Sequence, residues 1–97
     1  MQKEIPLEST WELKVALHLD GLDIQWIRPQ PVKWMDSRKV SRMYYPDFYL
    51  PDHQLYLDTK NPWCLMKDAE KLDRVCRIIR LEYGSLDHIF EVINELV

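Results

Sequence analysis

The stretch YYPDFYLPDHQLYLDTK, residues 44–60, decides how this chain is expected to fold. Residues 43–50 and 54–60 are rich in aromatic and aliphatic side chains, which favour β-strands. The Pro-Asp-His between them has turn chemistry, so the two segments are predicted to pair as an antiparallel hairpin. Three charged residues interrupt this apolar pattern: Asp47, Asp58 and Lys60.

The segment STWELKVALHLDG, residues 9–21, is predicted to form a helix before the hairpin. Ser9 and Glu12 have the spacing of a capping box, and Gly21 is a suitable stop. The expected apolar surface follows helical spacing. Its members are Leu13, Val15, Ala16, Leu17 and Leu19, with Asp20 one turn on.

Between this helix and the hairpin, residues 22–28 are predicted to form a strand that Pro29 and Pro31 terminate. Residues 32–35 are compatible with a second short strand, followed by a polar turn at residues 36–39.

After Pro62 the apolar period becomes helical and runs to a predicted stop at Gly84. The expected buried face of this helix consists of Leu65, Ala69, Leu72, Cys76 and Ile79. Residues 86–93 are mostly apolar and are predicted to form a final strand that is buried on both faces. The order helix, strands, helix, strand indicates an α/β domain with a mixed central sheet covered by helices.

Length and composition limit the possibilities further. The 97 residues are enough for a single domain, residues 1–97, and 46% of them are hydrophobic. No signal pattern or membrane-length apolar run is apparent, so a soluble, cytoplasmic protein is expected. The net charge of −3 counts against a coat that binds nucleic acid non-specifically, although it allows a nuclease. Cys64 and Cys76 are expected to be buried, reduced thiols.

The hairpin charges suggest a site for a cation. Asp47 and Asp58 lie on strands that are expected to be neighbours, where side chains on one face approach within about 5 Å. Two carboxylates at that separation repel each other unless a cation or a shared proton lies between them. Mg²⁺ suits such oxygen ligands. Lys60 is two residues after Asp58 and therefore projects from the same strand face, as phosphodiester hydrolysis would require.

These residues resemble the PD-(D/E)XK nuclease motif, with Pro46-Asp47 followed by Asp58-Thr59-Lys60. The longer strings STWELKVALHLDGLDIQW and YYPDFYLPDHQLYLDTKNPW are similar to the phage endonuclease I group of Holliday-junction resolvases. They also look like related small phage, homing and transposon-end nucleases. The resemblance covers residues 9–63 and implies a restriction-endonuclease-like core.

By this resemblance, Asp47, Asp58 and the backbone carbonyl of Thr59 would be metal ligands, and Lys60 would be the catalytic lysine. Glu12 would complete the acidic cluster as a catalytic residue and metal ligand. The implied cofactor is Mg²⁺, for which Mn²⁺ would substitute. Two positions depart from the family pattern, because Asp58 replaces the commoner Glu and Asn61 replaces the usual glycine.

Purely structural roles remain open for the same residues. Glu12 could simply be the capping-box partner of Ser9. Asp58 and Lys60 could form a charge pair that protects an edge strand from aggregation.

Two basic groups are candidate DNA contacts. One is expected in the loop before the hairpin and the other on the face of the second helix, where Asp68, Glu70 and Asp73 also permit an ordinary solvated surface. These DNA-binding candidates are Arg38, Lys39 and Arg42 in the loop, and Lys67, Lys71 and Arg74 on the helix.

The sequence therefore predicts a Mg²⁺-dependent endodeoxyribonuclease that acts on branched or junction DNA. A nicking, homing or transposon-end endonuclease is the alternative within the enzyme class, and a catalytically quiet DNA-binding or assembly module is the alternative outside it. Because two symmetric cuts require two active sites, a homodimer is expected. If the chain is phage-encoded, its location would be the host cytoplasm.

Overall fold

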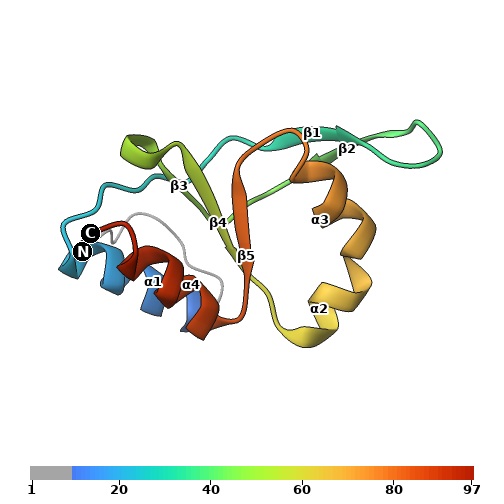
Figure 1. The fold of residues 1–97 in the computed structure, drawn as a ribbon. Coiled ribbons are helices and arrows are strands. Elements are labelled where there is room, and N and C mark those ends of the chain that lie inside the picture. The colour runs from blue at the N-terminus through green and yellow to red at the C-terminus, as the bar shows by residue number, and fades with distance from the viewer. Residues whose placement is uncertain (1–9) are drawn as a thin grey trace.

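The computed structural model describes residues 10–97, in which a mixed sheet is surrounded by helices (Figure 1). The fold is a small α/β domain, as the sequence predicts. Its elements in chain order are α1 (Thr10–Gly21), β1 (Val32–Met35), β2 (Ser41–Tyr44), β3 (Phe48–Leu50), the 3-10 turn η1 (Pro51–His53), β4 (Leu55–Thr59), α2 (Pro62–Lys67), α3 (Ala69–Val75), β5 (Leu81–Gly84) and α4 (Leu86–Asn94).

The central sheet has the strand order β3-β4-β5. β3 and β4 are antiparallel, with Phe48 opposite Leu57, which confirms a hairpin here. Its first strand is shorter than the predicted residues 43–50, because Met43 and Tyr44 belong to β2, which pairs with β1 instead. β5 runs parallel to β4, with Tyr83 opposite Asp58. The long connection through α2 and α3 allows this parallel pairing, because a parallel neighbour needs a crossover rather than a tight turn.

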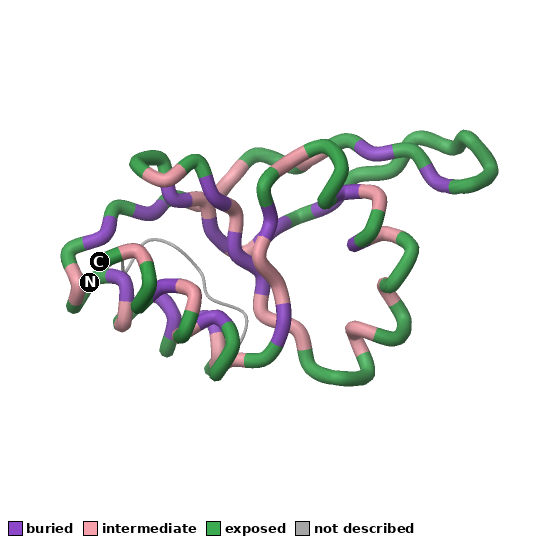
Figure 2. The backbone as a smooth tube through the Cα atoms, viewed as in Figure 1, coloured by how far each residue is buried: buried purple, intermediate pink, exposed green. Residues whose placement is uncertain are grey.

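The two faces of β4 contribute to different cores. Leu55 and Leu57 are fully buried in a cluster with residues of α1 and α4. Tyr56 points to the other face, where it packs with Leu72 of α3 and Trp34 of β1. This alternation is the period-two pattern of a strand covered on both sides. Figure 2 shows the buried backbone concentrated where the central strands pass between the helices.

β1 and β2 form a separate antiparallel ribbon, which extends beyond α3 in Figure 1. Trp34 and Tyr44 on the inner face of this ribbon are buried, whereas Met35 and Met43 on the outer face are about half exposed, at 52% and 49%. Asp36 stabilises the turn because its carboxylate accepts hydrogen bonds from the main-chain N–H groups of Arg38 and Val40.

The predicted strand at residues 22–28 is wrong. Only Ile27 makes a β-bridge, to Tyr49. Ile24 and Trp26 do point inward as their alternation predicts. Asp23 has a left-handed backbone (φ 60°), however, and prolines follow closely, so a continuous strand cannot form.

The predicted final strand is also wrong, because residues 86–93 lie in helix α4. Ser85 caps this helix by accepting a hydrogen bond from the N–H of His88, and Ile89 and Ile93 are buried one turn apart. The last strand is instead β5, at which Gly84 is the end of a strand and not of a helix. An Ile pair spaced by four residues matches a helical period as well as an apolar strand.

Two predicted helical faces need correction. In α1 the buried residues are Glu12, Val15, Ala16 and Leu19, whereas Leu13 and Leu17 are exposed. The predicted long helix after Pro62 is divided at Asp68 into α2 and α3. Only Leu72 of its expected face is fully buried, and Ala69 and Cys76 are exposed. Both cysteine thiols are free, but neither is buried as predicted: Cys64 is partly exposed and Cys76 is exposed.

Within residues 10–97, no helix is both long enough and apolar enough to cross a membrane. The predicted N-cap, Ser9, lies outside the described residues.

Candidate active site

Asp58 occupies the penultimate position of β4, on the face covered by α3 and the ribbon. Its side chain is only 4% exposed. The Tyr44 hydroxyl donates a hydrogen bond to Asp58 Oδ2, and Lys60 Nζ lies 3.4 Å from the same oxygen. Burial, followed by the charge of Asp58, raises the pKa of the Tyr44 hydroxyl, so this group remains a donor. A buried carboxylate of this kind needs such compensating partners.

Asp47 lies in a bend just before β3 and not in mid-strand as expected. Its Oδ2 accepts hydrogen bonds from the main-chain N–H and the hydroxyl of Thr59, both at 3.1 Å. It is also within hydrogen-bonding reach of Asp58. Burial, and then the charge of Asp58, raises the pKa of Asp47 to about 8. In the absence of a metal ion, Asp47 is therefore largely protonated at neutral pH.

Glu12 reaches the same region from α1, where it is buried with 5% exposure. Its negative charge contributes to the raised pKa of Asp47. Arg28 Nη1 donates to Glu12 Oε1 at 2.9 Å and to the main-chain carbonyl of Asp47 at 3.0 Å. Glu12 thus belongs to the cluster and is paired with a cation inside it.

Lys60 lies directly after β4 and connects two carboxylates. Its Nζ is 3.4 Å from Asp58 Oδ2 and 3.6 Å from Asp68 Oδ2. Burial acts to lower the pKa of Lys60, but the charges of Asp58 and Asp68 outweigh burial and raise it. The side chain is therefore an ammonium ion at neutral pH, suited to stabilise negative charge and not to act as a base.

The donor chemistry of this cluster fits Mg²⁺. Among the described residues, no group of three or more His, Cys, Asp and Glu side chains is arranged to hold an ion. Mg²⁺, however, usually retains several waters and needs only one or two protein carboxylates. Asp47 and Asp58 supply that pair. The Thr59 carbonyl points to the same strand edge as its N–H, which faces Asp47.

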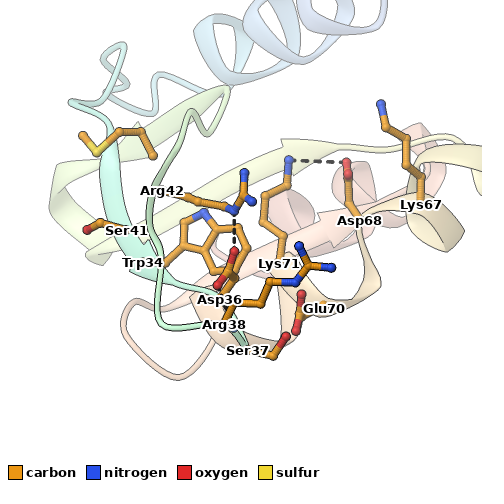
Figure 3. A pocket seen from close by; sticks show the side chains of 11 residues that line it. Trp34, Asp36, Ser37, Arg38, Ser41, Arg42, Lys67, Asp68, Glu70 and Lys71 are labelled. Atoms are coloured by element: carbon orange, nitrogen blue, oxygen red, sulfur yellow. Dashed lines mark hydrogen bonds and ion pairs between the residues drawn. The ribbon is translucent and has the colours of Figure 1, made fainter.

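A groove adjoins this cluster on the side of the ribbon and α2–α3, with a volume of about 790 Å³. Figure 3 shows basic side chains that project into it from both walls. Asp36 and Asp68 partly neutralise them: Arg42 Nε lies 2.6 Å from Asp36, and Lys71 Nζ lies 3.6 Å from Asp68. Asp68 also contacts Lys60, so it joins the groove to the acidic cluster. The basic lining residues are Arg38, Arg42, Lys67 and Lys71.

The structure brings together four of the six candidate DNA contacts and leaves two outside this groove. Lys39 lies in the turn at the tip of the ribbon, which the groove lining does not include. Arg74 is likewise outside the lining and pairs with Glu70 at 3.8 Å. Arg42, which was expected in a loop, lies on strand β2.

Three residues at the site were not identified from the sequence. Tyr44, Arg28 and Asp68 each contact at least one of the predicted site residues. Their spacing along the chain gives no sign of this, because the contacts depend on how the ribbon, the segment after α1 and the α2–α3 junction pack. The one feature of the sequence that could have indicated a role at the site is the position of Tyr44, three residues before Asp47.

Comparisons with protein-family models, curated proteins and solved structures find no match to this chain. Its functional interpretation therefore depends on the residues and geometry described above.

Proposed function

We propose that the chain is a Mg²⁺-dependent endodeoxyribonuclease with a restriction-endonuclease-like core. The observation that carries this proposal is the pairing of the buried Asp58 with the partly buried Asp47, beside the ammonium of Lys60. Two close carboxylates destabilise a fold unless they bind a proton or a cation. The raised pKa of Asp47 favours a functional role for this pair, because strongly shifted carboxylates cluster at functional sites.

Each residue of the cluster has a definable part in phosphodiester cleavage. Asp47, Asp58 and the Thr59 carbonyl would hold the metal ion. When bound, Mg²⁺ supplies Lewis-acid polarisation of a phosphate and lowers the pKa of a water molecule. Lys60, fixed by Asp58 and Asp68, places a positive charge where negative charge develops on the phosphate. Tyr44 holds Asp58 in place through its hydroxyl hydrogen bond.

The groove between the ribbon and α2–α3 is the reason to propose a nucleic-acid substrate. Basic side chains on both walls can neutralise backbone phosphates, and the contact of Asp68 with Lys60 means that these walls adjoin the proposed cleavage site. Its acidic members limit non-specific affinity, in agreement with the net charge of −3. A duplex with a branch or junction is the proposed substrate, and a homodimer is the proposed assembly for two paired cuts.

A panel of DNA substrates tests this proposal. Linear duplex, nicked duplex, single-stranded and four-way-junction DNA are incubated with the protein in Mg²⁺ or in chelator. Paired, Mg²⁺-dependent cuts at the junction are expected. Cuts confined to one strand of duplex DNA would favour a nicking endonuclease. Binding without cleavage of any substrate would leave only a DNA-binding or assembly module.

The metal-free protein is expected to lose stability as pH rises from about 5 to 8. The pKa of Asp47 is about 8 in the fold, compared with about 3.9 in an unfolded chain. Between these values the folded state binds more protons than the unfolded state, so rising pH favours unfolding. Thermal melts in chelator measure this slope. Mg²⁺ should raise the melting temperature more at pH 8 than at pH 5. At pH 8 a smaller fraction of Asp47 is protonated, so protons compete less with the metal ion for this carboxylate.

Asp47→Asn is the control for this pH dependence. The variant cannot ionise at position 47, so its melting temperature should change less between pH 5 and 8 and should respond weakly to Mg²⁺. An unchanged slope in Asp47→Asn would show that another group causes it.

Substitution of groove cations is expected to weaken DNA binding in a salt-dependent way. Arg38→Ala and Lys67→Ala each remove one cation from opposite walls of the groove. Each should reduce the slope of log affinity against log salt by about 0.9 for a lost duplex-phosphate contact. Fluorescence anisotropy at several salt concentrations measures this. Arg77→Ala is the matched control, because Arg77 is 73% exposed and pairs with Asp73. Equal effects in all three variants would argue against binding in the groove.

A further inference from the structure

Arg28 is fixed within the acidic cluster by three separate contacts. Its Nη1 donates to Glu12 Oε1 at 2.9 Å and to the main-chain carbonyl of Asp47 at 3.0 Å. Its guanidinium carbon lies 5.8 Å from the centre of the Phe48 ring, close enough for a favourable cation–π contact. Phe48 is fully buried at the start of β3 and cannot move easily. Arg28 is thus held in a defined position beside Glu12 and Asp47.

The balance of charge among these residues suggests a role for Arg28. Four carboxylates, those of Glu12, Asp47, Asp58 and Asp68, meet three cations, Arg28, Lys60 and Lys71. With all of them ionised, one negative charge remains uncompensated. A single divalent ion more than neutralises it. A second divalent ion would make the cluster strongly positive and would have to compete with Arg28 for Glu12.

We propose that Arg28 takes the position that a second metal ion would otherwise occupy, so that the centre binds one divalent cation. Asp47 and Asp58 hold this cation, while Glu12 is the counterion of Arg28 and not a metal ligand. Because a metal ion at Asp47 and Asp58 is itself the proposed function, this role of Arg28 rests on that function.

Arg28 also positions one of the ligands. Its hydrogen bond to the Asp47 carbonyl fixes the bend from which the Asp47 side chain projects. The Thr59 hydrogen bonds fix the same side chain from β4. Arg28 therefore compensates the charge of Glu12 and also positions Asp47. Replacing Arg28 with an uncharged residue removes both effects.

Counting bound Mn²⁺ in solution tests this assignment without measuring cleavage. Electron paramagnetic resonance of free Mn²⁺ gives the number of ions bound per chain for the protein and its variants. The wild type is expected to bind one ion. Glu12→Gln should also bind one, with nearly unchanged affinity, because Glu12 is not a ligand. Arg28→Met should bind a second ion, since Glu12 then lacks its guanidinium partner.

The double variant Glu12→Gln/Arg28→Met removes both members of the buried pair and guards against misfolding of Arg28→Met alone. It should bind one ion again. Two ions in the wild type, reduced to one in Glu12→Gln, would overturn the role assigned to Arg28 and leave the proposed function intact. No ion bound by the wild type would contradict the proposed function itself.

Discussion

Lys60→Ala is expected to reduce single-turnover DNA cleavage by about 100- to 1,000-fold, the usual cost of removing one donor that stabilises transition-state charge. The ammonium of Lys60 meets charge that develops only during the reaction, so substrate affinity should change far less than rate. Metal binding should persist, because Asp47 and Asp58 are unchanged. Rapid-quench cleavage with enzyme in excess, together with Mn²⁺ binding, separates these effects.

The structural alternative for Lys60 makes a different prediction. If Lys60 only paired with Asp58 to protect an edge strand, its removal would alter stability by less than about 1 kcal/mol and leave cleavage unchanged. In fact β4 is the central strand of its sheet, so edge protection is not needed there. Lys14→Ala, at an exposed position of α1, is the matched control and should cleave at the wild-type rate.

Asp58→Asn is expected to abolish metal binding and cleavage together. Groups that only support metal ligands cost about 10- to 100-fold in metal affinity when removed, so loss of a ligand should exceed this. The amide retains the shape of the side chain and can still accept the Tyr44 hydrogen bond, which keeps the fold intact. Calorimetric titration with Mn²⁺ measures the affinity, and circular dichroism checks the fold.

Asp73→Asn is the control for Asp58→Asn. Asp73 is 64% exposed on α3 and pairs with Arg77. Its substitution should change neither metal affinity nor rate. Full Mn²⁺ affinity in Asp58→Asn would mean that the ion binds elsewhere.

The hairpin could be predicted from sequence because its signals agree with one another. Phe48 and Leu50 on β3 alternate inward, as do Leu55 and Leu57 on β4, and a Pro-Asp-His turn joins the strands. Local pattern, turn chemistry and burial therefore specify the same structure. The first helix was predictable from its apolar spacing and from Gly21 at its end, although Glu12 is buried and Leu13 and Leu17 are exposed.

The last third of the chain was misread because its apolar pattern suits two structures. Residues 86–93 are apolar enough for a buried strand, yet Ser85 and the spacing of Ile89 and Ile93 favour a capped helix. Sequence alone also gave no reason to place β5 at Leu81–Gly84. Its parallel pairing with β4 is a long-range contact that no local signal encodes.

The charged residues of the candidate site were predictable as a set, whereas their partners were not. The spacing of Asp58 and Lys60 on one strand fixes a common face, which the structure confirms by their 3.4 Å contact. Glu12 is buried in α1, although the predicted buried face of this helix did not include it. Its ion pair with Arg28 compensates for this burial. Arg28 and Asp68 come to the site from separate segments, so only tertiary packing reveals them.

Diffraction from crystals grown with Mn²⁺ and measured at the manganese absorption edge locates the metal ion in the protein. We expect one strong anomalous peak between the carboxylates of Asp47 and Asp58, close to the Thr59 carbonyl, with Arg28 still paired to Glu12. If saturating Mn²⁺ gives no anomalous signal at these carboxylates, or gives peaks only at other residues, the proposed metal centre is wrong.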